Sequence, residues 1–550
     1  MAKKTINLGV TPDGEGGDDI RSAFTKTNEN FSELYTDKAD KEEGKQLSDE
    51  NYTLAEKNKL AGIADEATKN RADSENADKE HTHQASDITD LDTAIESKIV
   101  GELGQSETVA VSQKAVTDAL SLMTPIANNI GVAGQIGFGV GICPLEYDGM
   151  SEMLGTRIFG HDNYGNYQYS DGSVMAWVPA YFYRYGHPNN PTYATYGVNS
   201  IHVLPRHAYP TVLAAAVAGY ALHRAFYDDG VEQPGFFHDK YLCSNNDGIA
   251  SSIKNGNAIT SSAAHYPFNG LTGSPSNNFS GAIAAAKTRG DDYFPSASFL
   301  FDALAKLSLA HAQASTSSAA CAWYDSTGVS NFPKGCNNNA LGDAQDSSIE
   351  YESTGHETYD KAGLTGSAQP FNKTTHNGQA CGIADLNGLL WEILVGVTIL
   401  DGSYYILKKE ARMADLTAGV TLDTDAWGAA GLAKNYTELG PDFGALGTKS
   451  DRAIGSASQV FSSETEGLEW EAACSGIPLA GGMGGTNLFG NDRLYDTNMP
   501  EHMCIAAGGS WSRSVSAGVW ARTCDYSRAN SYNHCGFRSA LYLVKRSDSE

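Results

Sequence analysis

The spacing of apolar residues changes along the chain and predicts segments of different kinds. In residues 18–36 the apolar side chains recur at helical spacing, from Ile20 and Phe24 to Phe31, and Asp18 or Asp19 stands before them as a helix cap. We expect an amphipathic helix whose apolar face needs a partner. From about 37 to 108 the sequence is charged and polar, with too few apolar residues for a monomeric core, which predicts a thin stalk or linker.

Beyond the stalk, the pattern predicts a short helix and then a large domain. Residues 112–123 repeat apolar side chains at helical spacing behind Ser112. After Pro125, short β-like runs such as MAWVPAYFYRY (175–185) alternate with turn-rich loops up to about residue 545. We expect helices at 211–226 and 296–312 and a loop from 326 to 380. The predicted parts are an attachment region at 1–40, a stalk at 41–124 and an α+β domain at 125–550.

Composition narrows the possible partners of this 550-residue chain. A formal charge of −27 repels phosphate backbones and anionic lipid, so we expect neither nucleic acid nor membrane insertion. The start has no apolar signal-peptide core, and the longest apolar run, 211–222, is too short to span a bilayer. The nine cysteines are scattered without a CxxC pair, which favours reduced thiols over a disulfide framework.

Four consecutive segments near the N-terminus resemble modules of bacteriophage tail fibres. They are GGDDIRSAFTKTNENFSELYT, GKQLSDENYTLAEKNKLAGIADEATKN, HTHQASDITDLDTAI and SETVAVSQKAVTDAL, which together cover most of residues 14–122. The resemblance implies that the N-terminus attaches to tail or baseplate proteins of the particle and that the stalk is a homotrimer. Three chains sharing one buried seam would explain how so polar a stalk stays ordered.

The C-terminal domain resembles a second group, the C-type lectin fold shared by formylglycine-generating enzymes and by variable proteins of diversity-generating retroelements. The segments that carry this resemblance are PGFFHDKYLCSN (234–245), DLNGLLWEIL (385–394), GGSW (508–511) and GFRSA (536–540), with the helix around Phe301. The enzymes resembled use two cysteines shortly after GGS(Y/W), where Arg513 and Gly518 stand here. Since thiolate chemistry needs those sulfurs, we expect no such enzymatic activity.

The stretch between the two borders is similar to a retroelement-diversified segment. Errors at adenines in an Asn-rich template can yield most amino acids, but not Lys, Gln, Glu, Met or Trp, and none of these five occurs at positions 512–516, 523–526 and 531–535. The interpretation is that the borders hold the fold while segment 512–535 varies and binds. The predicted receptor-binding residues are Ser512, Arg513, Ser514, Ser516, Asp525, Tyr526, Ser531, Tyr532, Asn533 and His534. The predicted fold-defining residues are Trp391, Glu392, Gly508, Gly509, Trp511, Gly536, Phe537 and Arg538.

A few other residues have both a structural and a functional interpretation. We expect Trp520 in the core rather than as a sugar platform, and Trp391 buried with Glu392 bonded to backbone rather than catalytic. Some members of the fold bind calcium through an Asn whose place is taken here by Leu389, so no cofactor is predicted. If the segment were an extended strand, His81 and His83 would project from the same side and three copies could surround a metal, but a solvated loop is preferred.

Together these features predict a multidomain protein with an α-helical and extended trimeric stalk and a large α+β C-type-lectin-like domain. The resemblances imply a virion protein, synthesised in the host cytoplasm, that binds a bacterial surface glycan or surface protein. Adhesion rather than catalysis is expected. Two alternatives stay open: a tail enzyme that degrades capsule polysaccharide, and a structural tail-tip component without receptor binding.

Overall fold

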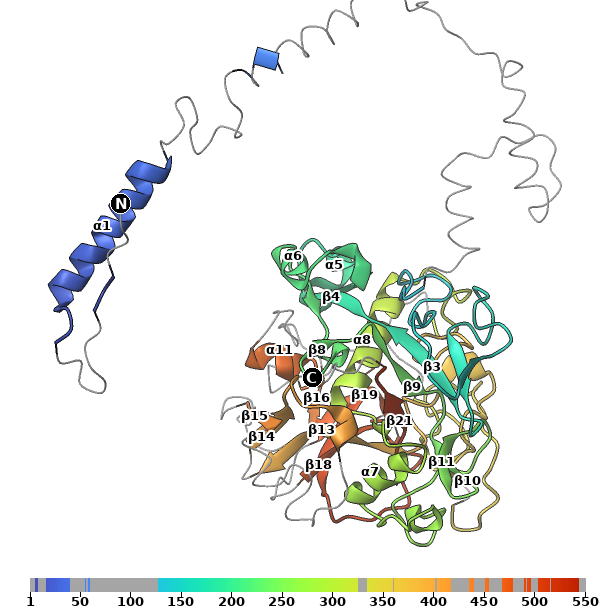
Figure 1. Ribbon diagram of the computed structural model, residues 1–550. Helices are drawn as coiled ribbons and strands as arrows, with labels where there is room; N and C mark the ends of the chain where they lie inside the picture. The colour runs from blue at the N-terminus through green and yellow to red at the C-terminus, as the bar shows by residue number, and fades with distance from the viewer. Residues whose placement is uncertain are drawn as a thin grey trace, which may run out of the picture. The chain divides into compact units, whose positions relative to one another are not determined.

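The computed structural model describes fifteen stretches of the chain, most of them within 127–543. They are residues 5–7, 16–39, 55, 58–59, 127–324, 334–359, 361–400, 403–416, 435–439, 451–454, 467–477, 489–490, 492–495, 503–514 and 516–543. The chain divides into two units, Met1–Ala110 and Val111–Glu550 (Figure 1). Across the described stretches, no helix combines the length and apolar character that crossing a membrane requires.

The first unit contains the predicted N-terminal helix, α1 (Ile20–Ala39). The backbone N–H of Ser22 donates to Asp19 Oδ1 over 2.8 Å at the start of the helix, which confirms the expected cap. Lys26 forms an ion pair with Asp18 at 2.6 Å. Phe24 is 65% exposed, so part of the apolar side of α1 is not covered within this unit.

Two large sheets build the second unit. The six-stranded sheet has the order β1 (Met150–Glu152), β2 (Asn166–Tyr169), β3 (Val174–Pro179), β9 (Gly235–Asp239), β21 (Ser539–Leu541), β12 (Phe294–Pro295), and its neighbours are antiparallel. The main path of the second sheet is β15 (Tyr436–Glu438), β14 (Ser403–Leu407), β13 (Trp391–Leu400), β18 (Met503–Gly508), β19 (Gly518–Ser527), β17 (Arg493–Tyr495), β16 (Asp451–Ala453). The short strand β20 (Cys535–Gly536) joins this sheet by pairing with β13 in parallel.

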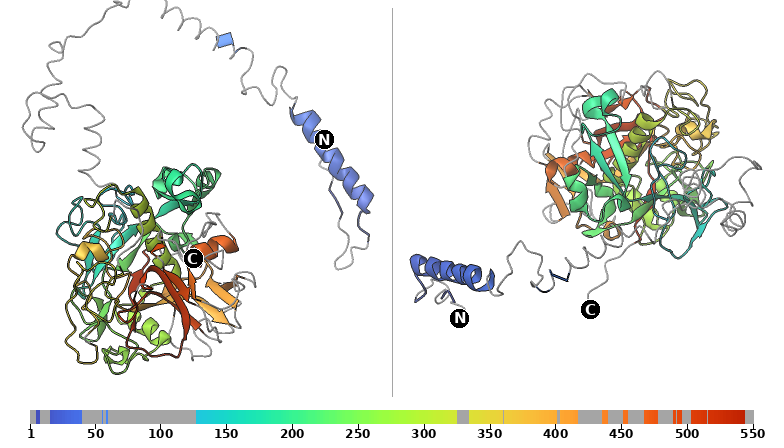
Figure 2. Two further views of the ribbon diagram at one scale, coloured as in Figure 1. Left: turned by 180° about the vertical axis from the view of Figure 1, so that it is seen from behind. Right: turned by 90° about the horizontal axis from the view of Figure 1, so that it is seen from above.

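Three small sheets complete the β-structure of the described residues. They are β5 (Ile201–Pro205) with β4 (Tyr181–Tyr185) and β6 (Ala221–Leu222), β7 (Tyr227–Asp228) with β8 (Val231–Glu232), and β10 (Cys243–Asn246) with β11 (Ile249–Ser252). The three-stranded sheet and the neighbouring helices α5 (Tyr193–Tyr196) and α6 (Val212–Val217) project from the rest of the unit (Figures 1 and 2).

The longest helix of this unit, α8 (Ser298–Ala314), is central to the core. Its residues from Ser298 to Gln313 are all buried, and it packs against β13, β18 and β19 and also against β5. The other helices are α7 (Phe279–Lys287) and α11 (Leu468–Ala473). Short 3-10 turns lie at Gly197–Asn199, Arg206–Ala208, Arg224–Phe226, Phe268–Gly270, Phe371–Thr374 and Met413–Asp415. The described part of the chain is therefore a mixed fold of helices and sheets, with more strand than helix.

The sequence pattern predicted some of these elements and missed others. The helix expected at 296–312 is confirmed by α8. The strand-like run 175–185 is confirmed as two strands, β3 and β4, which belong to different sheets. The helix predicted at 211–226 is wrong beyond Val217, because Gly219 adopts a positive φ of 78° and the chain continues into β6. The predicted helix at 112–123 lies outside the described residues.

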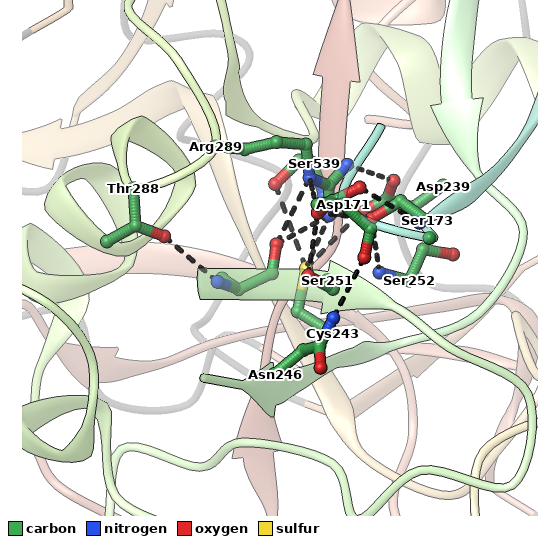
Figure 3. Close-up of polar contacts among 12 residues, drawn as sticks. Asp171, Ser173, Asp239, Cys243, Asn246, Ser251, Ser252, Thr288, Arg289 and Ser539 are labelled. Carbon is green, nitrogen blue, oxygen red and sulfur yellow. Dashed lines mark hydrogen bonds and ion pairs between the residues drawn. The ribbon is translucent and has the colours of Figure 1, made fainter. Parts of the chain in front are cut away.

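A buried polar network ties the six-stranded sheet to α7 and to the β10–β11 hairpin (Figure 3). The guanidinium of Arg289 donates to both carboxylate oxygens of Asp239, at 2.6 and 3.1 Å, and lies 3.3 Å from Asp171. Asp239 also accepts from the backbone N–H of Ser539 at 2.8 Å. Since the charges of this network face one another rather than solvent, we assign it to the framework.

Candidate functional site

Two glycines close the first border of segment 512–535. Gly508 at the end of β18 pairs with Gly518 at the start of β19, and φ is +87° at Gly508 and +92° at Gly509. A Cβ on Gly509 would lie 2.5 Å from the Cβ of Ala517. The turn can therefore close this tightly only with glycine at position 509.

Position 518 leaves no room for a side chain. A Cβ on Gly518 would lie 2.1 Å from the carboxylate of Asp492. That carboxylate forms a buried ion pair with Lys334 and accepts from the backbone N–H of Trp520 at 2.8 Å. Any side chain at position 518, a cysteine included, would therefore collide with this ion pair.

The second border is held by a buried ion pair. Strand β20 runs parallel to β13, so that Trp391 and Glu392 lie opposite Cys535 and Gly536. Arg538 Nε donates to Glu392 Oε1 over 2.9 Å, and neither side chain is exposed. The sequence placed Glu392 against backbone, and the structure instead pairs it with the Arg538 side chain. Burial raises the pKa of Glu392 to about 7, although the charge of Arg538 acts to lower it.

The remaining predicted framework residues differ in burial. Phe537 is fully buried and packs edge-on against Phe268, and Trp391 is 4% exposed. Trp520 is fully buried, which confirms its placement in the core. Trp511 is only partly buried, and its ring lies edge-on to the buried ring of Tyr359, with 6.1 Å between their centroids.

The middle of segment 512–535 is a core strand rather than a loop. In β19, Thr523 is 1% exposed and Cys524 is fully buried. Tyr526, which the sequence assigned to the binding surface, is 7% exposed. Variation at these positions would act on packing, so the accessible part of the segment is divided between its two ends.

The accessible residues at the two ends, together with Asp525 of β19, form what we call the variable-segment surface. Of the predicted residues, Ser514 and Ser531 are exposed. The partly buried members are Ser512, Arg513, Ser516, Asp525, Tyr532, Asn533 and His534.

Aromatic rings and one cation bring these two ends together. Tyr532 and His534 stack with 5.0 Å between ring centroids and 20° between planes, and the Tyr526 hydroxyl lies 3.2 Å from His534 Nε2 beneath them. The guanidinium of Arg513 lies 5.9 Å from the ring centre of Trp391. Arg513 also interacts with Tyr526, so one cluster includes residues from both ends of the segment.

Burial and the charge of Arg513 shift the pKa values of two groups in this cluster. Burial lowers the pKa of His534 to about 4, and the positive charge of Arg513 acts in the same direction. The imidazole is therefore neutral at pH 7. Burial raises the pKa of the Asp525 carboxyl, whereas Arg513 lowers it. At neutral pH the cluster offers a cation, a carboxyl group and two stacked rings.

Backbone bonds from a distant loop fix the second end. The backbone N–H of Tyr532 donates to Ser261 Oγ at 2.9 Å, and the backbone N–H of Ser261 donates to Cys535 O at 2.9 Å. Ser531 Oγ donates to Ser261 O, and the backbone N–H of Trp391 donates to His534 O at 2.8 Å. Most of these bonds involve main-chain atoms of residues 531–535, so the path of the loop depends little on its side chains.

Sequence reasoning missed a second group of residues that continues from Trp511. The Tyr359 ring packs against His265, whose ring centroid lies 5.3 Å away, and His265 and His356 are 4.8 Å apart. His265 Nε2 lies 2.6 Å from the Thr358 hydroxyl. No local motif marks these residues. The bonds of Ser261 to the loop at 531–535 and the contact of Tyr359 with Trp511 bring these residues to the candidate site.

One further group of titratable side chains is fully buried. Asp302 accepts from His223 Nε2 at 2.9 Å and pairs with Lys306, but all three side chains are fully buried.

A cavity of about 680 Å³ is lined by residues of the 143–157 region, including Glu146, Tyr147 and Arg157. Within the described ranges, no group of three or more His, Cys, Asp or Glu residues is placed to hold a metal. His81 and His83 lie outside these ranges.

Comparisons with known proteins identify no family. No family model matches this chain, and no curated protein matches it.

Proposed function

We propose that this protein is a bacteriophage tail-fibre or tail-tip receptor-binding protein and that the variable-segment surface contacts a receptor on the bacterial host. The receptor would be a surface glycan or a surface protein. The N-terminal unit would attach the fibre to tail or baseplate proteins, and the chain would assemble as a homotrimer. The protein would be synthesised in the host cytoplasm and act in the virion.

The observation that carries this proposal is the separation of backbone from side chain at residues 531–535. Ser261 and Trp391 bond to the main chain there, whereas the side chains of Tyr532, Asn533 and His534 are partly exposed. Such a loop can change its side chains without losing its path. Rigid rings with short polar groups also give contact area at modest entropic cost, as in other adaptable binding surfaces.

Adhesion through this surface would depend on multivalency. A half-exposed patch of this kind makes few contacts, and single-site binding is expected to be weak. Three sites per fibre and several fibres per particle raise the effective concentration at the cell surface, which increases avidity without any new contact.

Binding to a panel of bacterial strains tests the proposal. We expect the purified full-length protein to bind selected strains, and a variant with Tyr532→Ala, Asn533→Ala and His534→Ala to lose that binding while staying folded. The matched control changes His187, Asn189 and Tyr193 to Ala, because these are the same residue types with partial or full exposure in the β4–β5 connection. Equal loss in both variants, or in neither, would refute the assignment of the surface.

Two rival functions have their own tests. If the pure protein degrades purified capsule polysaccharide, it is a tail enzyme rather than an adhesin alone. If the gene from several clonal isolates varies no more at 512–514 and 531–534 than elsewhere, the protein is better explained as a structural tail-tip component.

A further inference from the structure

Exposed apolar side chains concentrate at the beginning of the second unit. Among its described residues, eight large apolar side chains are exposed, and five of them lie between positions 132 and 158. Four of these five we call the junction patch: Val132 at 67%, Ile136 at 42%, Leu154 at 85% and Ile158 at 56% exposure. Single exposed apolar residues are ordinary, but a cluster of this kind marks an interaction surface.

Two neighbouring turns carry the junction patch. A Cβ on Gly160 would lie 3.4 Å from Ile136 Cγ2, and a Cβ on Gly137 would lie 2.6 Å from the Phe159 ring. The turn at 131–138 therefore lies directly against the turn at 155–161. The residues of the patch therefore come from two adjoining segments of the chain rather than from separate parts of the surface.

Hydrogen bonds to the core hold the first of these turns in place. The backbone N–H of Gly134 donates to His311 Nδ1 of α8 at 3.1 Å, and that of Gly137 donates to Gln379 Oε1 at 2.6 Å. Asn377 donates to Phe138 O at 2.8 Å. The patch is thus preformed, since its backbone is fixed although its apolar side chains face solvent.

We propose that the junction patch is a contact surface between copies of this chain around the fibre axis. The proposal rests on the trimeric assembly given under the proposed function. Val132 lies five residues after position 127, where the described part of the unit begins, and five residues span at most about 18 Å. Copies joined through the preceding segment would therefore bring their patches close together.

The chemistry of the patch fits a permanent contact better than a receptor site. Surfaces between obligate partners are more apolar than the rest of a protein surface and have a polar rim. Exposed charged residues flank the patch, among them the ion pair of Arg157 with Glu152. The variable-segment surface, in contrast, contains mostly hydroxyl, amide and charged groups with two stacked rings.

Cysteine cross-linking of the full-length protein tests this inference. All nine native cysteines are buried and none forms a disulfide bond, so a cysteine at an exposed site will be the main target of a maleimide. Leu154→Cys introduces such a site at the most exposed residue of the patch, and Leu213→Cys is the control because Leu213 is 76% exposed on α6. A short bis-maleimide should join two copies of Leu154→Cys into a covalent dimer, with the third chain of each trimer left single because every chain has one reactive thiol, and should leave Leu213→Cys entirely as single chains.

Light scattering on the same samples separates the possible outcomes. If the protein is trimeric and only Leu154→Cys cross-links, the inference is supported. A trimer in which Leu154→Cys reacts with a single-ended maleimide but does not cross-link overturns the inference and leaves the proposed assembly intact, since the patch would then face solvent or another partner. A monomeric full-length protein overturns both.

Discussion

Arg538 Nε lies 2.9 Å from Glu392 Oε1, and both side chains are fully buried. This pair joins the chain that follows the variable segment to β13, the strand that begins with Trp391. The face of Trp391 lies near the guanidinium of Arg513 from the other end of the segment. One buried contact therefore stabilises the framework on which both ends of the variable-segment surface depend.

We expect the Arg538→Met variant to be less stable by about 3–5 kcal/mol, because it leaves the Glu392 carboxylate buried without its partner. Replacing both residues, Arg538→Met with Glu392→Leu, should reduce stability much less, because neither charge of the pair then stays buried without its partner. Urea unfolding followed by tryptophan fluorescence measures both effects. A single variant as stable as the double variant would show that the pair does not hold this border.

Tolerance to substitution should differ sharply within segment 512–535. Cys524→Asn places an amide in the core and should destabilise the protein by roughly 2–3 kcal/mol, whereas Asn533→Ser at the partly exposed loop should change stability by less than about 0.5 kcal/mol. Chemical denaturation of the two variants measures this difference. Equal costs would contradict the division of the segment into core and surface.

Gly509→Ala should be costly for a steric reason in addition to its backbone conformation. Gly509 and Gly273 both have positive φ, at 92° and 78°. A Cβ added at Gly509 would collide with Ala517, whereas a Cβ added at Gly273 would have no neighbouring atom within 4 Å. We expect about 1–2 kcal/mol of destabilisation for Gly273→Ala from the backbone alone and clearly more for Gly509→Ala. Similar unfolding midpoints for the two variants would argue against a tight turn at 509.

His311 should make stability depend on pH. Burial lowers the pKa of His311 to about 4, although its bond to Ala320 O acts in the opposite direction. Because the folded-state pKa lies below the value of about 6.5 in the unfolded chain, its contribution is fully present above pH 6.5 and is lost as the pH falls toward 4. Between pH 6.5 and pH 4, the free energy of unfolding of the wild type should fall by about 1.4 kcal/mol more per unit of decreasing pH than that of the His311→Gln variant. Parallel pH profiles for the two proteins would contradict a neutral buried His311.

The sequence predicted those features that depend on local pattern. Helix α8 follows from its apolar spacing, and the cap of α1 follows from the position of Asp19 before the first apolar residue of that helix. Features that depend on long-range contacts could not be predicted. Ser261 reaches the loop at 531–535 across 271 residues, and nothing in its local sequence marks it. The burial of Tyr526 was missed for the same reason, because it depends on pairing of β19 with β18.

The binding of two single-residue variants to a bacterial strain tests the central claim most directly. Arg513→Gln removes the cation that links the two ends of the variable-segment surface, whereas Arg412→Gln removes a partly exposed arginine outside both this surface and the junction patch. We expect Arg513→Gln to reduce binding of the full-length protein to a recognised strain at least about tenfold, which corresponds to a loss of about 1.4 kcal/mol in the overall binding free energy. Arg412→Gln should bind like the wild type. Unchanged binding by Arg513→Gln together with the Tyr532, Asn533 and His534 triple variant would contradict the assignment of this surface as the receptor site.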